Sequence, residues 1–202
     1  MPERSEKADA APAAASVLQR SLRLSEMLDL PSFAEVCKGF ADLYKVGVKV
    51  FEEGGDKLVD IREGSIEFCS YVYGFPNGKA LCTRTALRAK EGPVEVKPAG
   101  RGGPAGVFPV PCFAGCRYLV MPIFLDGDLL GRVIFGPFVP EELRELPASV
   151  AATLGQGFQV GQGLEFLRKM RRAPEHAIAK ITGHFASVVD ALVYAGQKVL
   201  LT

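Results

Sequence analysis

Cysteine is the residue type in this sequence with the most varied chemistry, and four of its five copies lie in the middle of the chain. Thiolates bind zinc and the iron of iron–sulfur clusters, and neutral thiols pack as small, polarisable groups in cores and pockets. Metal ligation, pocket lining and plain core packing are therefore the three roles open to these residues. The four cysteines are Cys69, Cys82, Cys112 and Cys116.

The spacing of these cysteines does not decide between the three roles. Cys112 and Cys116 are separated by three residues, whereas zinc knuckles ordinarily use a pair separated by two. The other gaps between cysteines match no metal-binding pattern. An odd total of five cysteines, with no export signal before them, favours reduced thiols over a disulfide framework. We therefore expect a cytoplasmic protein with free thiols.

The composition argues against several broad functions. Apolar residues make up 48% of the chain and charged residues 23%, as in ordinary folded proteins. A net charge of +1 provides no field to hold the chain on nucleic acid or an anionic membrane, and we expect neither partner. The longest apolar run, residues 119–125, is far short of the roughly 20 residues that span a bilayer. The sequence has no nucleophile elbow, phosphate-binding loop, zinc-protease motif or dinucleotide fingerprint, so we expect no enzyme.

Changes in pattern along the chain divide it into three expected parts. Residues 1–16 are rich in alanine, proline and charge without a hydrophobic period, which predicts a disordered tail. Residues 17–140 alternate between helical and strand patterns and are expected to form the folded domain. Residues 141–202 are again helical, and we expect them to form a C-terminal extension that serves in dimerisation or signalling.

The folded domain is expected to begin with two helices. Helical periodicity runs over residues 17–27 and is stopped by Pro31. A second helix then starts with a capping box, in which the Ser32 hydroxyl and the Glu35 side chain satisfy the first backbone amides. Further helical patterns follow at residues 65–73 and 79–90.

Alternating apolar residues on either side of glycine-containing turns predict two β-hairpins. The helical patterns lie between the hairpins, and a stretch rich in proline and glycine, residues 98–111, is expected to be a surface loop. This order favours an α+β fold, in which one antiparallel sheet carries helices on one face and is flanked by N- and C-terminal helices. The hairpins are expected at residues 48–51 with 58–61 and at residues 118–125 with 129–138.

Several short motifs, in this order along the chain, resemble the PocR-type sensory domain, a family of ligand-sensing modules attached to bacterial transcription regulators and histidine kinases. The resemblance covers roughly residues 20–195 and implies a PAS-like fold that senses simple hydrocarbon derivatives such as propanediol-like diols. The chain departs from the family at Cys116, where an apolar residue is usual. The matching motifs are a leucine-rich segment at residues 24–30, Phe68-Cys69, Cys82, Cys112 to Gly115, Pro122-Ile123, Gly131 and Gly136-Pro137.

Three hypotheses for function follow from the residues and from the resemblance. The first is a regulatory module that binds a small organic molecule and signals to a partner protein in trans. The second is a metal or redox sensor in which Cys69, Cys82, Cys112 and Cys116 ligate zinc or an iron–sulfur cluster. The third is an interaction scaffold without a ligand. For the first, the expected pocket residues are Phe68, Cys69, Cys82, Cys112, Tyr118 and Phe135.

The last helical segment has the most regular pattern in the chain. Its apolar residues alternate steps of three and four from Ile178 to Val199, which is the a/d stripe of three heptads. Such a stripe either packs on its own domain or pairs with the same helix of a second copy. The expected homodimer contacts are Ile178, Ile181, Phe185, Val188 and Leu192.

Overall fold

The computed structural model describes residues 22–94 and 106–200. In this part of the chain, six strands form one sheet with the order β2-β1-β5-β4-β3, and β6 pairs with β5 beyond this path. The first five strands pair antiparallel, and β6 runs parallel to β5. The strands are β1 (Val48–Glu52), β2 (Lys57–Ile61), β3 (Phe108–Pro111), β4 (Arg117–Leu125), β5 (Asp128–Pro140) and β6 (Arg172–Ala173).

Both predicted hairpins are present, and they join into a single sheet. β1 pairs with β2, and β4 pairs with β5 across a turn in which Asp126 and Gly127 have positive φ. β1 then pairs along β5, with Val50 opposite Val133. The predicted PAS-like α+β class, with one antiparallel sheet flanked by helices, is therefore confirmed.

The predicted loop at residues 98–111 is wrong at its end, because its last four residues form β3. Residues 98–105 lie outside the described part of the chain. β3 is an edge strand, and Pro109 and Pro111 are tolerated there because a strand at the edge needs amide donors on one side only.

The predicted start of the second helix is also corrected. α3 begins at Leu30, and the Asp29 carboxylate caps it by accepting a hydrogen bond of 3.3 Å from the Ser32 amide. Pro31 lies in the first turn instead of stopping the preceding helix, since amides in that turn have no helical acceptor to lose. α5 likewise begins at Pro76, three residues earlier than expected.

Seven helices occur in the described residues. Of the helix expected over residues 17–27, residues 22–23 are not helical and α2 forms the rest of the described part. Residues 17–21 and the expected tail at residues 1–16 lie outside the described residues. The helices are α2 (Leu24–Met27), α3 (Leu30–Tyr44), α4 (Glu67–Tyr73), α5 (Pro76–Glu91), α6 (Ala148–Leu154), α7 (Val160–Lys169) and α8 (Glu175–Leu200).

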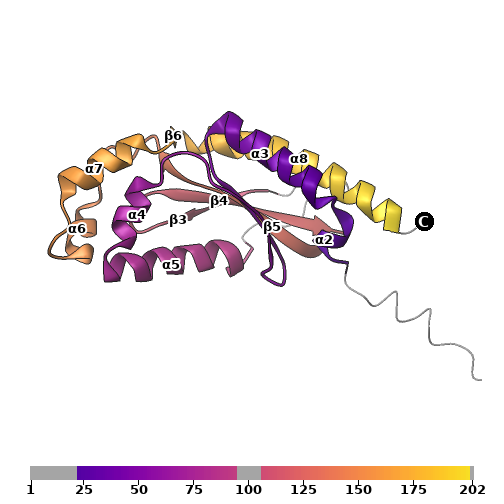
Figure 1. Cartoon of the computed structure of the whole chain (residues 1–202), viewed down its shortest axis with the longest axis horizontal. Helices are drawn as coiled ribbons and strands as arrows, with labels where there is room; N and C mark the ends of the chain where they lie inside the picture. Colours follow the sequence, from indigo (N-terminus) through magenta and orange to yellow (C-terminus); the bar gives the residue numbers. More distant parts are fainter. Residues whose placement is uncertain (1–21, 95–105, 201–202) are drawn as a thin grey trace, which may run out of the picture.

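Helices cover both faces of the sheet, where the sequence pattern led us to expect them on one. α3 and α8 lie over one face and α5 lies over the other (Figure 1). The reason is visible in the two longest strands, whose central residues are buried without alternation. A strand that is apolar on both sides exposes one apolar face unless each face is covered.

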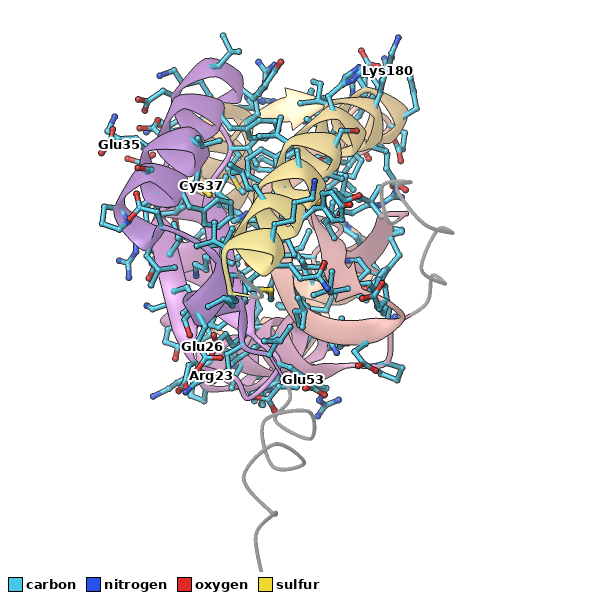
Figure 2. The ribbon with its side chains drawn as sticks, turned by 90° about the vertical axis from the view of Figure 1, so that its right-hand side faces the viewer. Arg23, Glu26, Glu35, Cys37, Glu53 and Lys180 are labelled. Atoms are coloured by element: carbon cyan, nitrogen blue, oxygen red, sulfur yellow. The ribbon has the colours of Figure 1, made fainter. Side chains whose placement is uncertain are left out.

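The two faces have separate cores. On the α3 and α8 face, side chains of β1, β4 and β5 pack against Phe33 and Phe185. Figure 2 shows α3 and α8 side by side on this face, with Glu35 and Lys180 toward the outside. On the α5 face, Ala89 packs against a smaller group of strand residues, which comprises Phe108, Val110, Val120 and Ile134.

The segment after residue 140 shares these cores with the rest of the chain. α6 and α7 pack with α4 in a third apolar cluster at one end of the sheet, and α8 contributes Phe185, Val189 and Val193 to the core under α3. α8 is long and apolar enough to cross a membrane by length and composition alone, and part of it is buried in the domain. Its buried stripe is that of a helix packed on a sheet.

Candidate functional site

Five of the six residues expected to line a pocket gather at one end of the sheet, on the side covered by α4 and α5. Cys69, Cys82 and Cys112 pack against the apolar cluster that contains Phe68. Tyr118 follows on β4 and joins the group, because each of these thiols contributes to the rise in its pKa. We call Phe68, Cys69, Cys82, Cys112 and Tyr118 the thiol site.

Four elements of the fold bring the thiol site together. α4 supplies Phe68 and Cys69, and α5 follows it after only two residues and supplies Cys82. The connection between β3 and β4 supplies Cys112, and β4 itself supplies Tyr118. The three cysteines of the site are partly buried and none is in a disulfide.

A tight turn positions Cys112 opposite Cys116. Pro111 and Arg117 are the last paired residues of the β3–β4 hairpin, so the two cysteines face each other directly beyond them. The Cys112 amide donates a hydrogen bond of 2.9 Å to the Cys116 carbonyl. Gly115 has a φ of 89°, and a Cβ there would lie 2.8 Å from Leu143, so this position requires glycine. In the sequence, the glycine near the end of the short connection between two strand patterns is the signal of this turn.

The turn stabilises Cys112 as a thiolate. The Cys116 thiol donates a hydrogen bond to the Cys112 sulfur, and this is the largest influence on the pKa of Cys112. Burial opposes the effect, and backbone amides of Ala114, Cys116 and Gly115 add to it, so that the pKa of Cys112 falls to about 7. Hydrogen bonds to a charged form favour that form. The same pairing and burial raise the pKa of Cys116 well above its ordinary value.

The other groups of the site are held in their protonated forms. Burial raises the pKa of Cys69 to about 12 and that of Cys82 to about 11, and the neighbouring thiols add to both shifts. Burial also raises the pKa of the Tyr118 hydroxyl, and Cys69 and Cys112 contribute further. At neutral pH the site therefore offers neutral thiols and a phenol beside one partly ionised sulfur.

Phe135 does not belong to the thiol site, so this part of the predicted pocket is corrected. Its side chain is 0% exposed and packs on the opposite face of the sheet, with ring centroids 5.2 Å from Phe40 and 5.5 Å from Phe185. Ile134, the residue before it, is the one that faces α5. Successive side chains of a strand point to opposite faces, so a shift of one residue moves a side chain to the other core.

The geometry gives no support to the metal hypothesis. Within residues 22–94 and 106–200, no group of three or more His, Cys, Asp or Glu side chains converges closely enough to hold a metal ion. Cys69, Cys82, Cys112 and Cys116 lie in one region but do not form a ligand set for zinc or an iron–sulfur cluster.

The fold defines a class of protein, a PAS-like α+β domain in which helices flank one sheet. The family described as the sensory domain found in PocR matches residues 26–197, which is most of the 202-residue chain. The chain belongs to this family of PocR sensory domains, as its motifs predict. The match runs through α6, α7 and most of α8, so it includes the segment after residue 140. No curated protein and no solved structure matches the chain.

Proposed function

We propose that the domain senses a small, largely apolar molecule with one or two hydroxyl groups, and binds it at the thiol site. One observation carries this proposal: a phenol and three partly buried thiols from α4, α5, β4 and the β3–β4 connection gather beside Phe68. The Tyr118 hydroxyl can donate and accept hydrogen bonds, and thiols are weak donors with polarisable sulfur. Phe68 supplies apolar contact. This combination suits a short diol and has no fixed charge to bind an anionic ligand.

The size of such a ligand limits its affinity. Very small ligands gain at most about 1.5 kcal/mol per non-hydrogen atom, and propane-1,2-diol has about five. The binding free energy is therefore about 7 kcal/mol at best, which corresponds to a Kd of roughly 10 μM or weaker. A sensor of this affinity responds to a ligand that reaches micromolar to millimolar concentrations.

Propane-1,2-diol is expected to raise the Tm of the purified protein. At 100 times its Kd, a ligand that binds only the folded state stabilises it by about 2.7 kcal/mol, or roughly 5–10 °C for a domain of this size. The Tyr118→Phe variant removes the hydroxyl and should weaken binding about tenfold, because a hydrogen bond in a buried site is worth about 1 kcal/mol or more. Thermal denaturation across a series of diols measures both effects.

A matched control separates the site from the rest of the surface. Tyr73 lies on α4 with 47% of its area exposed, and the Tyr73→Phe variant should bind as the unmodified protein does. Equal shifts in the Tyr118→Phe and Tyr73→Phe proteins would place binding elsewhere. No shift with any short diol or monoalcohol would contradict this proposal.

We also propose that ligand binding is passed to a partner protein in the cytoplasm through α8. β4 connects the two regions, since Tyr118 lies at the thiol site while Leu119 and Met121 on the same strand pack in the core under α8. A ligand that shifts β4 therefore shifts the surface on which α8 rests. Such a ligand changes the populations of α8 positions by its difference in affinity for them.

We propose that the domain forms a homodimer through fewer residues than the sequence pattern predicts. Ile178 and Phe185 are only 4% and 3% exposed, because they pack in the core of their own domain and leave no surface for a partner. Ile181 is partly buried, whereas Val188 and Leu192 are 45% and 36% exposed. We therefore keep Val188 and Leu192, one helical turn apart, as the seam between two copies.

The Val188→Asp, Leu192→Asp double variant should be monomeric where the unmodified protein is dimeric, because it places like charges opposite each other at the seam. Light scattering after size-exclusion chromatography measures the mass of each species. Leu43 on α3 is 71% exposed, and Leu43→Asp is the control that should leave the dimer intact. A monomeric unmodified protein at about 100 μM, a concentration well above the Kd of specific dimers, would contradict the dimer.

A further inference from the structure

The Cys112–Cys116 turn has a feature that ligand sensing does not use. Its two thiols occupy opposite positions at the end of an antiparallel hairpin, where paired residues have Cα atoms about 4.5–5.5 Å apart. A disulfide requires Cα atoms about 4.4–6.8 Å apart. The spacing of an antiparallel pair is therefore within the range that a disulfide spans, and the Cys112 amide already bonds to the Cys116 carbonyl at 2.9 Å. The two thiols also interact directly, because each is the largest influence on the pKa of the other.

The two thiols of the turn are also unlike each other. Cys112 is partly buried and its sulfur receives hydrogen bonds from the Cys116 thiol and from backbone amides of the turn. Cys116 is 2% exposed and keeps its proton. A thiolate is the nucleophilic form of cysteine, so Cys112 is the attacking sulfur and Cys116 is the thiol placed to resolve its oxidised form.

The remaining described cysteines do not share these properties. Burial raises the pKa of Cys37, Cys69 and Cys82 to about 12, 12 and 11, so they remain thiols at neutral pH. Cys37, on α3, is also fully buried. Selective oxidation at one turn follows from this difference in thiolate fraction and from the second thiol opposite Cys112.

We propose that Cys112 and Cys116 form a reversible dithiol–disulfide pair that hydrogen peroxide oxidises. The Cys112 thiolate attacks one peroxide oxygen, the S–O bond forms, the O–O bond breaks, and hydroxide leaves as water after it takes a proton. Cys112 is then a sulfenic acid. The Cys116 sulfur gives up its proton and attacks Cys112, the S–S bond forms, and the S–O bond breaks to release a second water. Two thiols and one peroxide thus give one disulfide and two waters, and a small dithiol reverses the step.

The pair adds a redox input to a domain whose proposed ligand is a neutral diol. Oxidation converts Cys112 from a thiolate to a neutral disulfide sulfur within the thiol site. The disulfide also links the two arms of the β3–β4 hairpin covalently, next to Tyr118. The oxidation itself needs no ligand, so it can be measured whether or not a diol binds.

The test uses the full chain, treated with hydrogen peroxide, alkylated and digested with trypsin. Both cysteines fall in one tryptic peptide, residues 102–117, because no Lys or Arg lies between Arg101 and Arg117. We expect this peptide to be lighter by two hydrogen atoms and protected from alkylation, and dithiothreitol to restore its mass. Cys69 and Cys82 fall in other peptides and should stay alkylatable in denaturant.

Single variants check the assigned roles. Cys116→Ser should leave a sulfenic acid on Cys112 that dimedone traps, and Cys112→Ser should lose peroxide sensitivity. Cys37→Ala, at a cysteine outside the thiol site and the turn, should still form the disulfide. The alkylation rate of Cys112 should rise with a midpoint near pH 7 and exceed that of Cys82 about tenfold or more at neutral pH. A disulfide that joins Cys112 to Cys69 or Cys82, or a peptide 102–117 that stays reduced in folded protein, would overturn the proposal.

Discussion

The Phe135→Ala variant should lose about 3–5 kcal/mol of unfolding free energy, the cost of removing a fully buried aromatic side chain and leaving a cavity. Phe135 is 0% exposed, and its ring contacts Phe40 of α3 and Phe185 of α8. The three rings join β5 to both helices above it. Because folded domains of this size are stable by only about 5–15 kcal/mol, the variant should unfold at a much lower denaturant concentration.

The control for this prediction is Leu43→Ala. Leu43 is 71% exposed on α3, and its loss should change the unfolding free energy by less than about 0.5 kcal/mol. Urea denaturation followed by circular dichroism measures both variants. If Phe135→Ala weakened diol binding while its stability stayed near that of the unmodified protein, Phe135 would be a ligand contact and its placement in the core would be wrong.

Gly196→Ala should destabilise the domain by about 1–3 kcal/mol or detach the end of α8. A Cβ at this position would lie 1.9 Å from the carbonyl oxygen of Met27, so the two helices must move apart. That atom belongs to the backbone of α2 and cannot turn aside as a flexible side chain does. The cost of extra volume in a packed contact outweighs the gain in helix propensity from glycine to alanine, which is at most about 1 kcal/mol.

The same helix provides a matched control at Gly183. A Cβ there meets nothing within 4 Å, so Gly183→Ala should stabilise the protein by up to about 1 kcal/mol through helix propensity alone. Urea denaturation gives the free energies, and limited proteolysis shows whether the end of α8 is released. Equal effects of the two substitutions would contradict the close approach of α8 to α2.

Local patterns were sufficient for much of the fold. Both hairpins were predictable because turn residues and alternating apolar residues act over a few positions, and α4 and most of α5 followed from helical composition. The start of α3 was predicted wrongly because Pro31 was interpreted as a stop, although a proline in the first turn loses no hydrogen bond. The strand β3 was missed because the prolines and glycines of residues 98–111 suggested a loop, and only a place at the sheet edge makes Pro109 and Pro111 acceptable in a strand.

The sequence of α8 is compatible with two different buried faces of the helix. The buried stripe comprises residues three or four positions apart, namely Ile178, Thr182, Phe185, Val189 and Val193. The predicted stripe instead included Val188 and Leu192, which are exposed. Both stripes are available on a helix that is apolar around much of its surface. Thr182 belongs to the buried stripe because its hydroxyl donates to the Ile178 carbonyl at 2.8 Å, which removes the cost of burying it.

By itself, the sequence determined the α+β class, the two hairpins and the membership in the PocR sensory family, since these depend on short-range patterns and on the order of motifs. Only the tertiary structure decided which residues meet. It placed Phe135 in the core and Tyr118 at the thiol site because strand register sends neighbouring side chains to opposite faces. It also placed Cys116 opposite Cys112, because the residues that face each other in a hairpin depend on where the strand pairing ends.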